Sequence, residues 1–183
     1  MHIVRSDWHP APARLPAGQM CVAVGDIHGM SRHLEALQDA LEHDVTTHLA
    51  SRGATADRVY LGDYLDHGPD GGAVLDRVRE ALSRPDGRAY ALVGNHDAVL
   101  LDLLHARLCD GDIADWRADG GEATLDAFTV PASDRSDPDA LAAALNARLG
   151  GARRRFVETL RSSHQTGPYL FVHAGVHPIH DLH

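Results

Sequence analysis

Four short segments of the chain carry side chains that are able to bind metal ions. Each places an acidic, imidazole or amide side chain directly after a short apolar run and ahead of a glycine or a stretch with helical character. Aspartate, histidine and asparagine are oxygen and nitrogen donors that suit Mn, Fe, Zn or Mg. None of the four segments contains cysteine, so a closed structural zinc site is not expected. The segments are residues 25–29 (GDIHG), 62–69 (GDYLDHGP), 94–97 (GNHD) and 171–175 (FVHAG).

The first two segments supply three candidate ligands. Asp26 and His28 stand at positions i and i+2 just past an apolar run. On extended backbone two such side chains point the same way, so both can reach one metal. Asp63 follows a second apolar run, and its two carboxylate oxygens could bridge two metals. Each residue alone also has an ordinary explanation, because a Gly-Asp pair after a strand is usually a turn.

The last two segments add an amide and two imidazoles. Asn95 offers a neutral oxygen ligand, although a helix cap is the alternative. His96 follows it directly and need not be a ligand, and His173 is either a ligand or a core histidine. Because donors occur at four independent strand ends, the set as a whole predicts a metal centre.

Strands and helices alternate along the chain in a way that would bring these segments together. The order strand, donor segment, helix occurs three times, which favours βαβ connections and a largely parallel sheet in an α/β fold. Such folds keep their chemistry at the carboxyl ends of the strands. The predicted strands are residues 19–24, 58–61, 89–93 and 169–172, and the predicted helices are residues 31–51, 74–82, 99–104, 138–150 and 152–162. The first helix should bury Leu34, Leu37, Leu41, Val45 and Leu49, which are spaced by three and four residues.

Two parts of the chain carry weaker patterns. Residues 1–18 are polar and rich in proline, and are predicted to form a leader that is not a signal peptide. Residues 111–138 are predicted to form an ordered loop around Trp116, with residues 129–138 as its most flexible stretch. In neither part are apolar residues spaced in a way that predicts a helix or a strand.

Composition narrows the classes of function. The 183 residues include 26 acidic and 17 basic side chains, and the net charge of -9 argues against nucleic acid or an anionic membrane as the main partner. No run approaches the roughly 18 apolar residues of a membrane span. The two cysteines, Cys21 and Cys109, indicate a reduced, cytoplasmic protein. A phosphorylated substrate stays compatible with the acidic charge, because bound metals would reverse the local potential.

In combination, the four segments resemble the signature blocks of the calcineurin-like metallophosphoesterases. More narrowly, they resemble those of the phosphoprotein phosphatase branch, which includes bacterial serine/threonine protein phosphatases and symmetrical diadenosine tetraphosphate hydrolases. The resemblance runs from about Arg14 to Pro178 and includes Trp116 with the following GGEATL sequence. It implies one metallophosphoesterase domain over residues 1–183, built as a four-layer αββα sandwich. It also implies hydrolysis of phosphoesters by water activated between two divalent metal ions such as Mn, Fe or Zn.

The resemblance also assigns roles by position. It implies that Asp26 and His28 bind the first metal and that Asp63 bridges both. Asn95 and His173 would bind the second metal, Asn95 also contacting the substrate. The general acid would be His96, oriented by Asp66.

Three features depart from the family pattern. His67 stands where the family has an arginine that clamps the phosphate, so it is expected to bind substrate more weakly. Asp97 replaces a glutamate, a difference expected to matter less. The family has a further metal-binding Gly-His block, whereas this chain ends at His183. The second sheet should therefore be truncated and the second metal weakened, unless a histidine of the tail replaces the missing ligand; the candidates are His177, His180 and His183.

The sequence leaves several functions open. The first hypothesis is a phosphatase acting on phosphoserine or phosphothreonine in proteins, weakly favoured by Asp66. The alternative enzyme is a symmetrical diadenosine tetraphosphate hydrolase, or a hydrolase of another small phosphoanhydride. The alternative of another class is a truncated, non-catalytic domain that binds metal or phosphate. A strand left without its neighbours would have an open edge, so self-association through that edge is expected as well.

Overall fold

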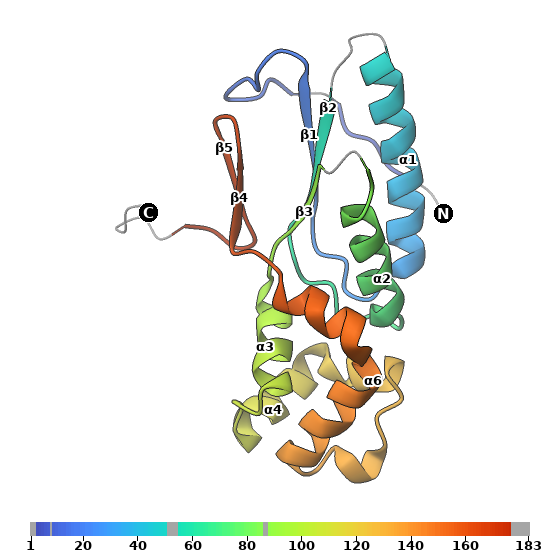
Figure 1. Ribbon diagram of the computed structural model, residues 1–183, viewed down its shortest axis with the longest axis vertical. Coiled ribbons are helices and arrows are strands. Elements are labelled where there is room, and N and C mark those ends of the chain that lie inside the picture. The colour runs from blue at the N-terminus through green and yellow to red at the C-terminus, as the bar shows by residue number, and fades with distance from the viewer. Residues whose placement is uncertain (1–2, 8, 51–54, 86–87, 177–183) are drawn as a thin grey trace.

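Three parallel strands form the sheet that the alternating pattern predicts (Figure 1). The computed structural model describes residues 3–7, 9–50, 55–85 and 88–176. Its sheet has the order β1-β2-β3, with β2 paired in parallel to both neighbours. The strands are β1 (Gln19–Val24), β2 (Thr55–Tyr60) and β3 (Ala89–Ala91). The mixed α/β fold class is therefore confirmed, with β2 beginning and β3 ending earlier along the chain than predicted.

Two helices lie on the same side of this sheet (Figure 1). They are α1 (Ser31–Ala50) and α2 (Gly71–Leu82). In α1, Leu34 and Val45 are buried and Leu37 and Leu41 are partly buried. The side chain of Leu49, expected on the same face, lies outside the described residues. The α2 helix is capped by Asp70, whose Oδ1 accepts a hydrogen bond from the Ala73 N–H at 3.3 Å, and it buries Val74, Leu75 and Val78.

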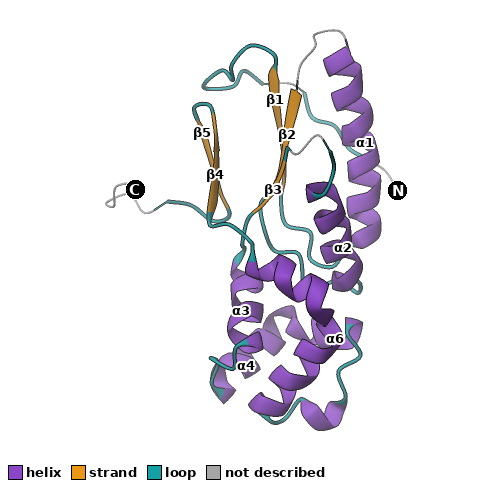
Figure 2. Ribbon diagram, viewed as in Figure 1, coloured by secondary structure: helices purple, strands orange, loops and turns teal. Residues whose placement is uncertain are grey.

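Helices fill the region that was predicted to be a loop (Figure 2). The prediction of an ordered loop over residues 111–138 is wrong, because short helices occupy most of this range. They bury apolar residues such as Ile113 and Leu125. The interruption at Gly120, with φ of 99°, hides the helical period. Residues 129–138 are held by Arg135, which donates to Glu122 and Asp126. The elements are α3 (Asn95–Leu104), α4 (Asp110–Trp116), the π-helical η1 (Arg117–Gly121), α5 (Glu122–Ala127), the 3₁₀ turn η2 (Ala132–Asp134) and α6 (Pro138–Glu158).

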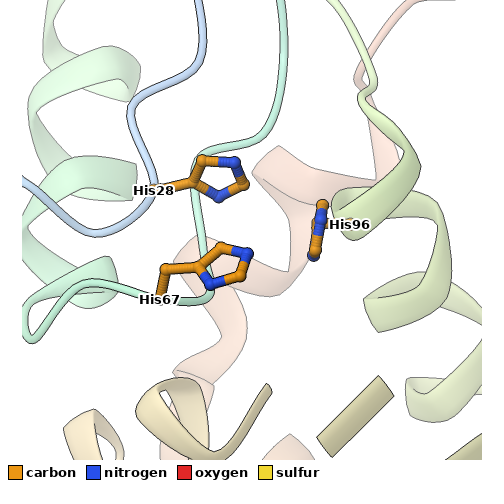
Figure 3. A group of neighbouring side chains, drawn as sticks. All are labelled: His28, His67 and His96. Atoms are coloured by element: carbon orange, nitrogen blue, oxygen red, sulfur yellow. The ribbon is translucent and has the colours of Figure 1, made fainter. Parts of the chain in front are cut away.

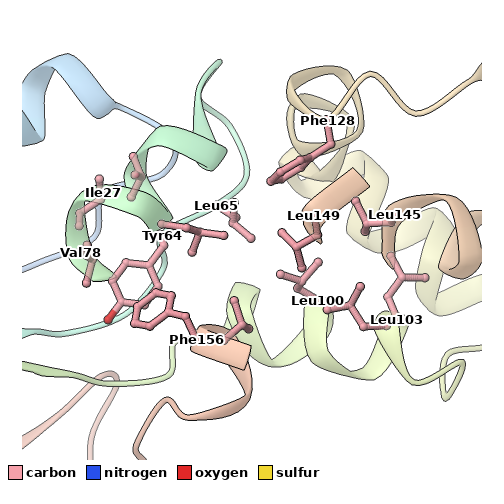
Figure 4. Packing of buried hydrophobic residues seen from close by; sticks show 14 of the residues in the cluster. Ile27, Tyr64, Leu65, Val78, Leu100, Leu103, Phe128, Leu145, Leu149 and Phe156 are labelled. Atoms are coloured by element: carbon pink, nitrogen blue, oxygen red, sulfur yellow. The ribbon is translucent and has the colours of Figure 1, made fainter. Parts of the chain in front are cut away.

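The boundary expected at Gly150 is present as a kink in α6. Gly150 has φ of 78° and ψ of 153°, a conformation that interrupts the helix and that glycine adopts without strain. The parts of α6 on both sides pack on one core, because Leu145, Leu149 and Phe156 are all buried. Figure 4 shows this core running from Tyr64 and Val78 beside the sheet to Leu145 among the helices, so the two regions share one apolar interior.

A two-stranded antiparallel sheet closes the described part of the chain. It consists of β4 (Ser163–Thr166) and the expected strand β5 (Tyr169–Val172). The sequence did not indicate β4, because SHQT has no apolar alternation. The Thr166 hydroxyl donates to buried Asp57 on β2 at 2.5 Å, which ties the hairpin to the main sheet. This short second sheet agrees with the expected small second layer.

No helix within the described residues has the length and apolar character needed to cross a bilayer. The expected role of the tail histidines cannot be placed in this fold, because His177, His180 and His183 lie outside the described residues.

Candidate metal centre

Strained loops at the strand ends carry most of the candidate ligands. Of the six non-glycine residues with positive φ among those that the structure describes, four lie here: His28, Asp63, Asp66 and His67, with φ between 44° and 67°. Such conformations are uncommon for these residue types and persist where surrounding contacts impose them. One such contact is the Asp63 carbonyl, which accepts hydrogen bonds from the backbone of Ile27 at 3.0 Å and of His28 at 2.9 Å. The first two donor segments are therefore joined through their backbones.

Asp97 fastens the second and third segments together. Its carboxylate is fully buried and accepts hydrogen bonds from three backbone N–H groups, those of Asp63 at 2.8 Å, Gly94 at 2.9 Å and Tyr64 at 3.1 Å. Burial raises the pKa of Asp97 to about 6, while these hydrogen bonds act in the opposite direction. A Cβ atom at Gly94 would collide with Asp63, so this approach requires glycine. The shorter carboxylate, which replaces the glutamate of the family, still reaches all three N–H groups and holds two ligand loops in register.

The first group of donors consists of Asp26, His28 and Asp63. A ligand atom from each lies within 4.8 Å of the other two. The His28 Nδ1 lies 2.8 Å from the Leu65 carbonyl, which can only accept, so this nitrogen carries the proton and Nε2 keeps its lone pair in the neutral ring. Nε2 lies 3.7 Å from the Asp63 Oδ2. Two carboxylates and an oriented imidazole fit a divalent cation.

The second group of donors shares Asp63 with the first. The His173 Nε2 lies 3.3 Å from the Asp63 Oδ2 and 3.0 Å from the Asn95 Oδ1. Its Nδ1 is 3.0 Å from the Leu61 carbonyl, which fixes this ring as in His28. The other oxygen of Asp63 accepts the His96 N–H at 3.1 Å, so Oδ2 alone faces both groups. The structure thus brings together all five side chains that were expected to bind metal.

His96 stands beside these groups in a chain of buried hydrogen bonds. Its Nδ1 lies 2.8 Å from Oδ2 of the buried Asp66. Burial lowers the pKa of His96, but the hydrogen bond to Asp66 and the nearby charges of Asp63, Asp66 and Asp119 outweigh it, so the pKa is raised overall. Asp66 thereby fixes the ring and favours its protonated form.

Two residues that the sequence did not assign hold Asp66 in place. The Trp116 Nε1 donates to its Oδ2 at 2.8 Å, and the Thr124 hydroxyl donates to its Oδ1 at 2.6 Å. Thr124 Oγ1 also accepts the Asp66 N–H at 3.0 Å. Both residues belong to the segment that resembles bacterial family members, which was the only signal for them.

His67 completes a group of three imidazoles (Figure 3). Its ring centroid lies 4.7 Å from that of His28 and 5.3 Å from that of His96. The side chain is exposed, and its backbone N–H donates to the Gly120 carbonyl at 3.1 Å. His67, which was expected to contact phosphate, is therefore exposed to solvent and also lies beside the donor groups.

An acidic cavity of about 370 Å³ opens next to His96. Its three carboxylates come from α4 and η1, and Trp116 also lines it. Its lining residues are Asn95, His96, Val99, Leu108, Asp112, Asp115, Trp116 and Asp119. A second cavity of about 390 Å³ lies between α1, α2 and the sheet, and none of its lining residues belongs to the donor groups. The cavity beside His96 is therefore the one that a substrate could share with the metal centre.

Comparison with known proteins identifies the family. The family model described as calcineurin-like phosphoesterase matches residues 21–179. The chain belongs to the calcineurin-like phosphoesterases. A crystal structure described as that of a "putative diadenosine tetraphosphatase" is similar to this phosphoesterase, with 21% sequence identity and a TM-score of 0.53. The match covers 91% of this chain and 59% of that chain, and at this identity it shows a shared fold only. None of the curated proteins compared with the phosphoesterase matches it.

Proposed function

We propose that the chain is a metal-dependent phosphoester hydrolase that acts on phosphoserine or phosphothreonine in proteins. The observation that carries this proposal is Oδ2 of Asp63, which faces His28 at 3.7 Å and His173 at 3.3 Å at the junction of two donor groups. In our proposal, Asp26, His28 and Asp63 hold one divalent ion. Asp63, Asn95 and His173 hold a second. When bound, such ions neutralise phosphoryl oxygens and make water a stronger nucleophile near pH 7.

The protein's own contribution to the chemistry is proton transfer by His96. With Nδ1 committed to Asp66 at 2.8 Å, a protonated ring presents its Nε2–H to the cavity, where the leaving oxygen of a phosphoester would sit. Transfer of that proton removes the negative charge that develops on the leaving group, which is typically worth about 10²–10⁴ in rate. Asp66 acts as the positioning residue. His67 and Asn95, both facing the same space, would contact the phosphate.

Replacement of the proton donor tests this assignment. In His96→Asn, kcat for an alkyl phosphate should fall by about 10²–10³-fold, and kcat for an aryl phosphate should fall less because its leaving group needs less protonation. Metal content, measured by elemental analysis, should stay at the wild-type value. Equal losses on both substrates would contradict the role, and loss of metal would show that His96 is a ligand.

The charge of the cavity favours a protein substrate over a polyphosphate. Asp112, Asp115 and Asp119 line the space beyond His96. A tetraphosphate chain lying there would bring further negative charge against three carboxylates, which is unfavourable at short range even in water. A phosphorylated residue flanked by lysine or arginine would meet the opposite charge instead. The presence of Asp66, which weakly favoured a protein phosphatase in the sequence analysis, is consistent with a protein substrate.

Hydrolysis of diadenosine tetraphosphate is the second candidate, and the similar crystal structure favours it. Rates with Mn²⁺ on three substrates separate the candidates: a phosphopeptide with basic flanks, the same peptide with acidic flanks, and diadenosine tetraphosphate. The first should show the highest kcat/KM, and Asp115→Asn should reduce its advantage over the acidic peptide several-fold. Asp139→Asn, an exposed aspartate at the start of α6, is the matched control and should leave the ratio unchanged.

Two other results would overturn the proposal. Faster hydrolysis of diadenosine tetraphosphate than of either peptide would support the second candidate. Binding of metal without hydrolysis of any phosphoester would support a non-catalytic metal-binding domain.

A further inference from the structure

The three imidazoles of His28, His67 and His96 converge from two strand-end loops and from the first turn of α3 (Figure 3). Their ring centroids are 4.7, 5.0 and 5.3 Å apart, and one ring nitrogen from each lies within 4.8 Å of the other two. The rings meet edge to face and not stacked, with interplanar angles of 89°, 88° and 65°. Such an arrangement lets three nitrogens point at one centre.

The hydrogen bonds on these rings match those of metal-binding histidines. The Nδ1 of His28 is hydrogen-bonded to the Leu65 carbonyl, and the Nδ1 of His96 is hydrogen-bonded to the Asp66 carboxylate. Both N···O distances are 2.8 Å. A histidine that binds a metal usually donates its other N–H to a carbonyl or carboxylate, which orients the ring and raises its basicity. In both neutral rings the lone pair is therefore on Nε2. Within the described ranges no hydrogen bond occupies the ring of His67, so it can take whichever tautomer the site needs.

The surroundings of His67 limit where its ring can go. His67 has φ of 57°, and its backbone is held by the Gly120 carbonyl at 3.1 Å. A Cβ atom on Gly120 would lie 2.5 Å from the His67 Nδ1, so the ring packs directly on the backbone of η1. Nitrogens bound to one tetrahedral zinc are about 3.4 Å apart, given Zn–N bonds of about 2.0–2.1 Å. The three nitrogens, which lie within 4.8 Å of one another, would therefore have to move closer together on binding, and His67 is the exposed residue of the three.

We propose that His28, His67 and His96 form an alternative zinc-binding site, which shares His28 with the first donor group and inhibits the enzyme when occupied. Three neutral imidazoles select Zn²⁺ and similar borderline ions over Mn²⁺ or Mg²⁺, which prefer oxygen ligands. Occupation would take the Nε2 of His28 away from Asp26 and Asp63. It would also take the lone pair of His96 and fill the place of the phosphate. The inhibition rests on the function proposed above, whereas the binding of zinc does not.

The binding is tested by titration with Zn²⁺ against a chromophoric chelator. His67→Gln removes one of the three imidazoles and should weaken the tightest zinc binding of the apoprotein by at least about tenfold. His43→Gln, an exposed histidine on α1, is the matched control and should not change it. In nuclear magnetic resonance spectra, zinc should shift the ring nitrogens of His67. Zinc affinity unchanged by His67→Gln, or no shift at His67, overturns the site.

The inhibition is tested on the enzyme preloaded with Mn²⁺. Added Zn²⁺ should inhibit hydrolysis of an aryl phosphate competitively, and His67→Arg should raise the inhibition constant at least about tenfold, because arginine offers no lone pair to a metal. Equal inhibition of both proteins would mean that zinc replaces Mn²⁺ at the other donor groups, which refutes the inhibitory role. If no phosphoester is hydrolysed at all, the titration still decides whether the zinc site exists.

Discussion

The sheet region and the helical region of this molecule are built differently and do different work. In β1 only Val24 of six residues is buried, and Leu170 on β5 is 38% exposed. Among the helices, Leu125, Leu141 and Leu145 are fully buried. The thinly covered strands β1 and β5 lead to the donors Asp26, His28 and His173, and the well-packed helices supply the groups that fix Asp66. The candidate site therefore lies between the strand-end loops and the well-packed helices.

This division predicts which property each substitution changes. Changes in the loops at the strand ends should act first on metal binding, and changes in the core of the helices should act first on the free energy of unfolding. Changes at the contacts between the two regions should act on proton transfer alone.

The largest effect is expected for Asp63→Asn in the sheet loops. The substitution removes the charge shared by both donor groups, so the metal content should fall at both and kcat should fall on the order of 10³-fold. Metal analysis and hydrolysis of an aryl phosphate measure the two effects. Retention of both metals with full activity would show that Asp63 does not bridge them.

The next effect is on the stability of the helical region. Leu145→Ala empties a fully buried site and should lower the free energy of unfolding by about 2–5 kcal/mol. Leu170→Ala, the same chemical change on the exposed β5, should cost less than about 1 kcal/mol. Urea unfolding of the two variants measures the difference. Similar costs would remove the contrast between the two regions.

A smaller effect is expected where Asp97 joins the ligand loops. Asp97→Asn replaces one acceptor oxygen by an N–H₂ group that cannot accept from the backbone, so stability should fall by about 1–3 kcal/mol. Metal affinity should fall with it, because the loops of Asp63 and Asn95 lose their register. A variant of wild-type stability with wild-type metal affinity would mean that the loops are held by other contacts.

The smallest effect is expected at the contact between the regions. Trp116→Phe removes one hydrogen bond to Asp66 and should lower kcat for an alkyl phosphate by about three- to tenfold, equivalent to about 0.5–1.5 kcal/mol. Metal content and the rate on an aryl phosphate should change little. An equal loss on both substrates would indicate a general distortion of the site instead of an effect on His96.

Much of the sheet region could be predicted from the sequence because its signals are local. Each apolar run is followed directly by its donor, so Asp26, His28, Asp63, Asn95 and His173 were all found where the structure brings them together. The family and the mixed α/β fold are confirmed, whereas the serine/threonine phosphatase branch stays a prediction, as does self-association through an open strand edge.

The parts that could not be predicted depend on distant contacts. Trp116 and Thr124 reach Asp66 from 50 and 58 residues away, and no local pattern announces those hydrogen bonds. Asp97 bonds to the backbone of a loop 33 and 34 residues away, and the sequence assigned it no role in holding that loop. The helices between residues 110 and 134 are short and broken at Gly120, which is too little length for a 3.6-residue period to stand out.

The single oxygen shared by the two donor groups makes the binding of one cation depend on the other. By linkage, each ion changes the affinity of the other by the same factor. Asp63 is already held in place without metal, because its N–H donates to Asp97 and its Oδ1 accepts from the His96 N–H. The first ion therefore orders Asp63 little further, and this ordering adds little to the affinity for the second ion. Mutual repulsion of the ions then outweighs any gain from ordering. Loading should be negatively cooperative, and over a range of metal concentration the protein should be populated as a one-ion species.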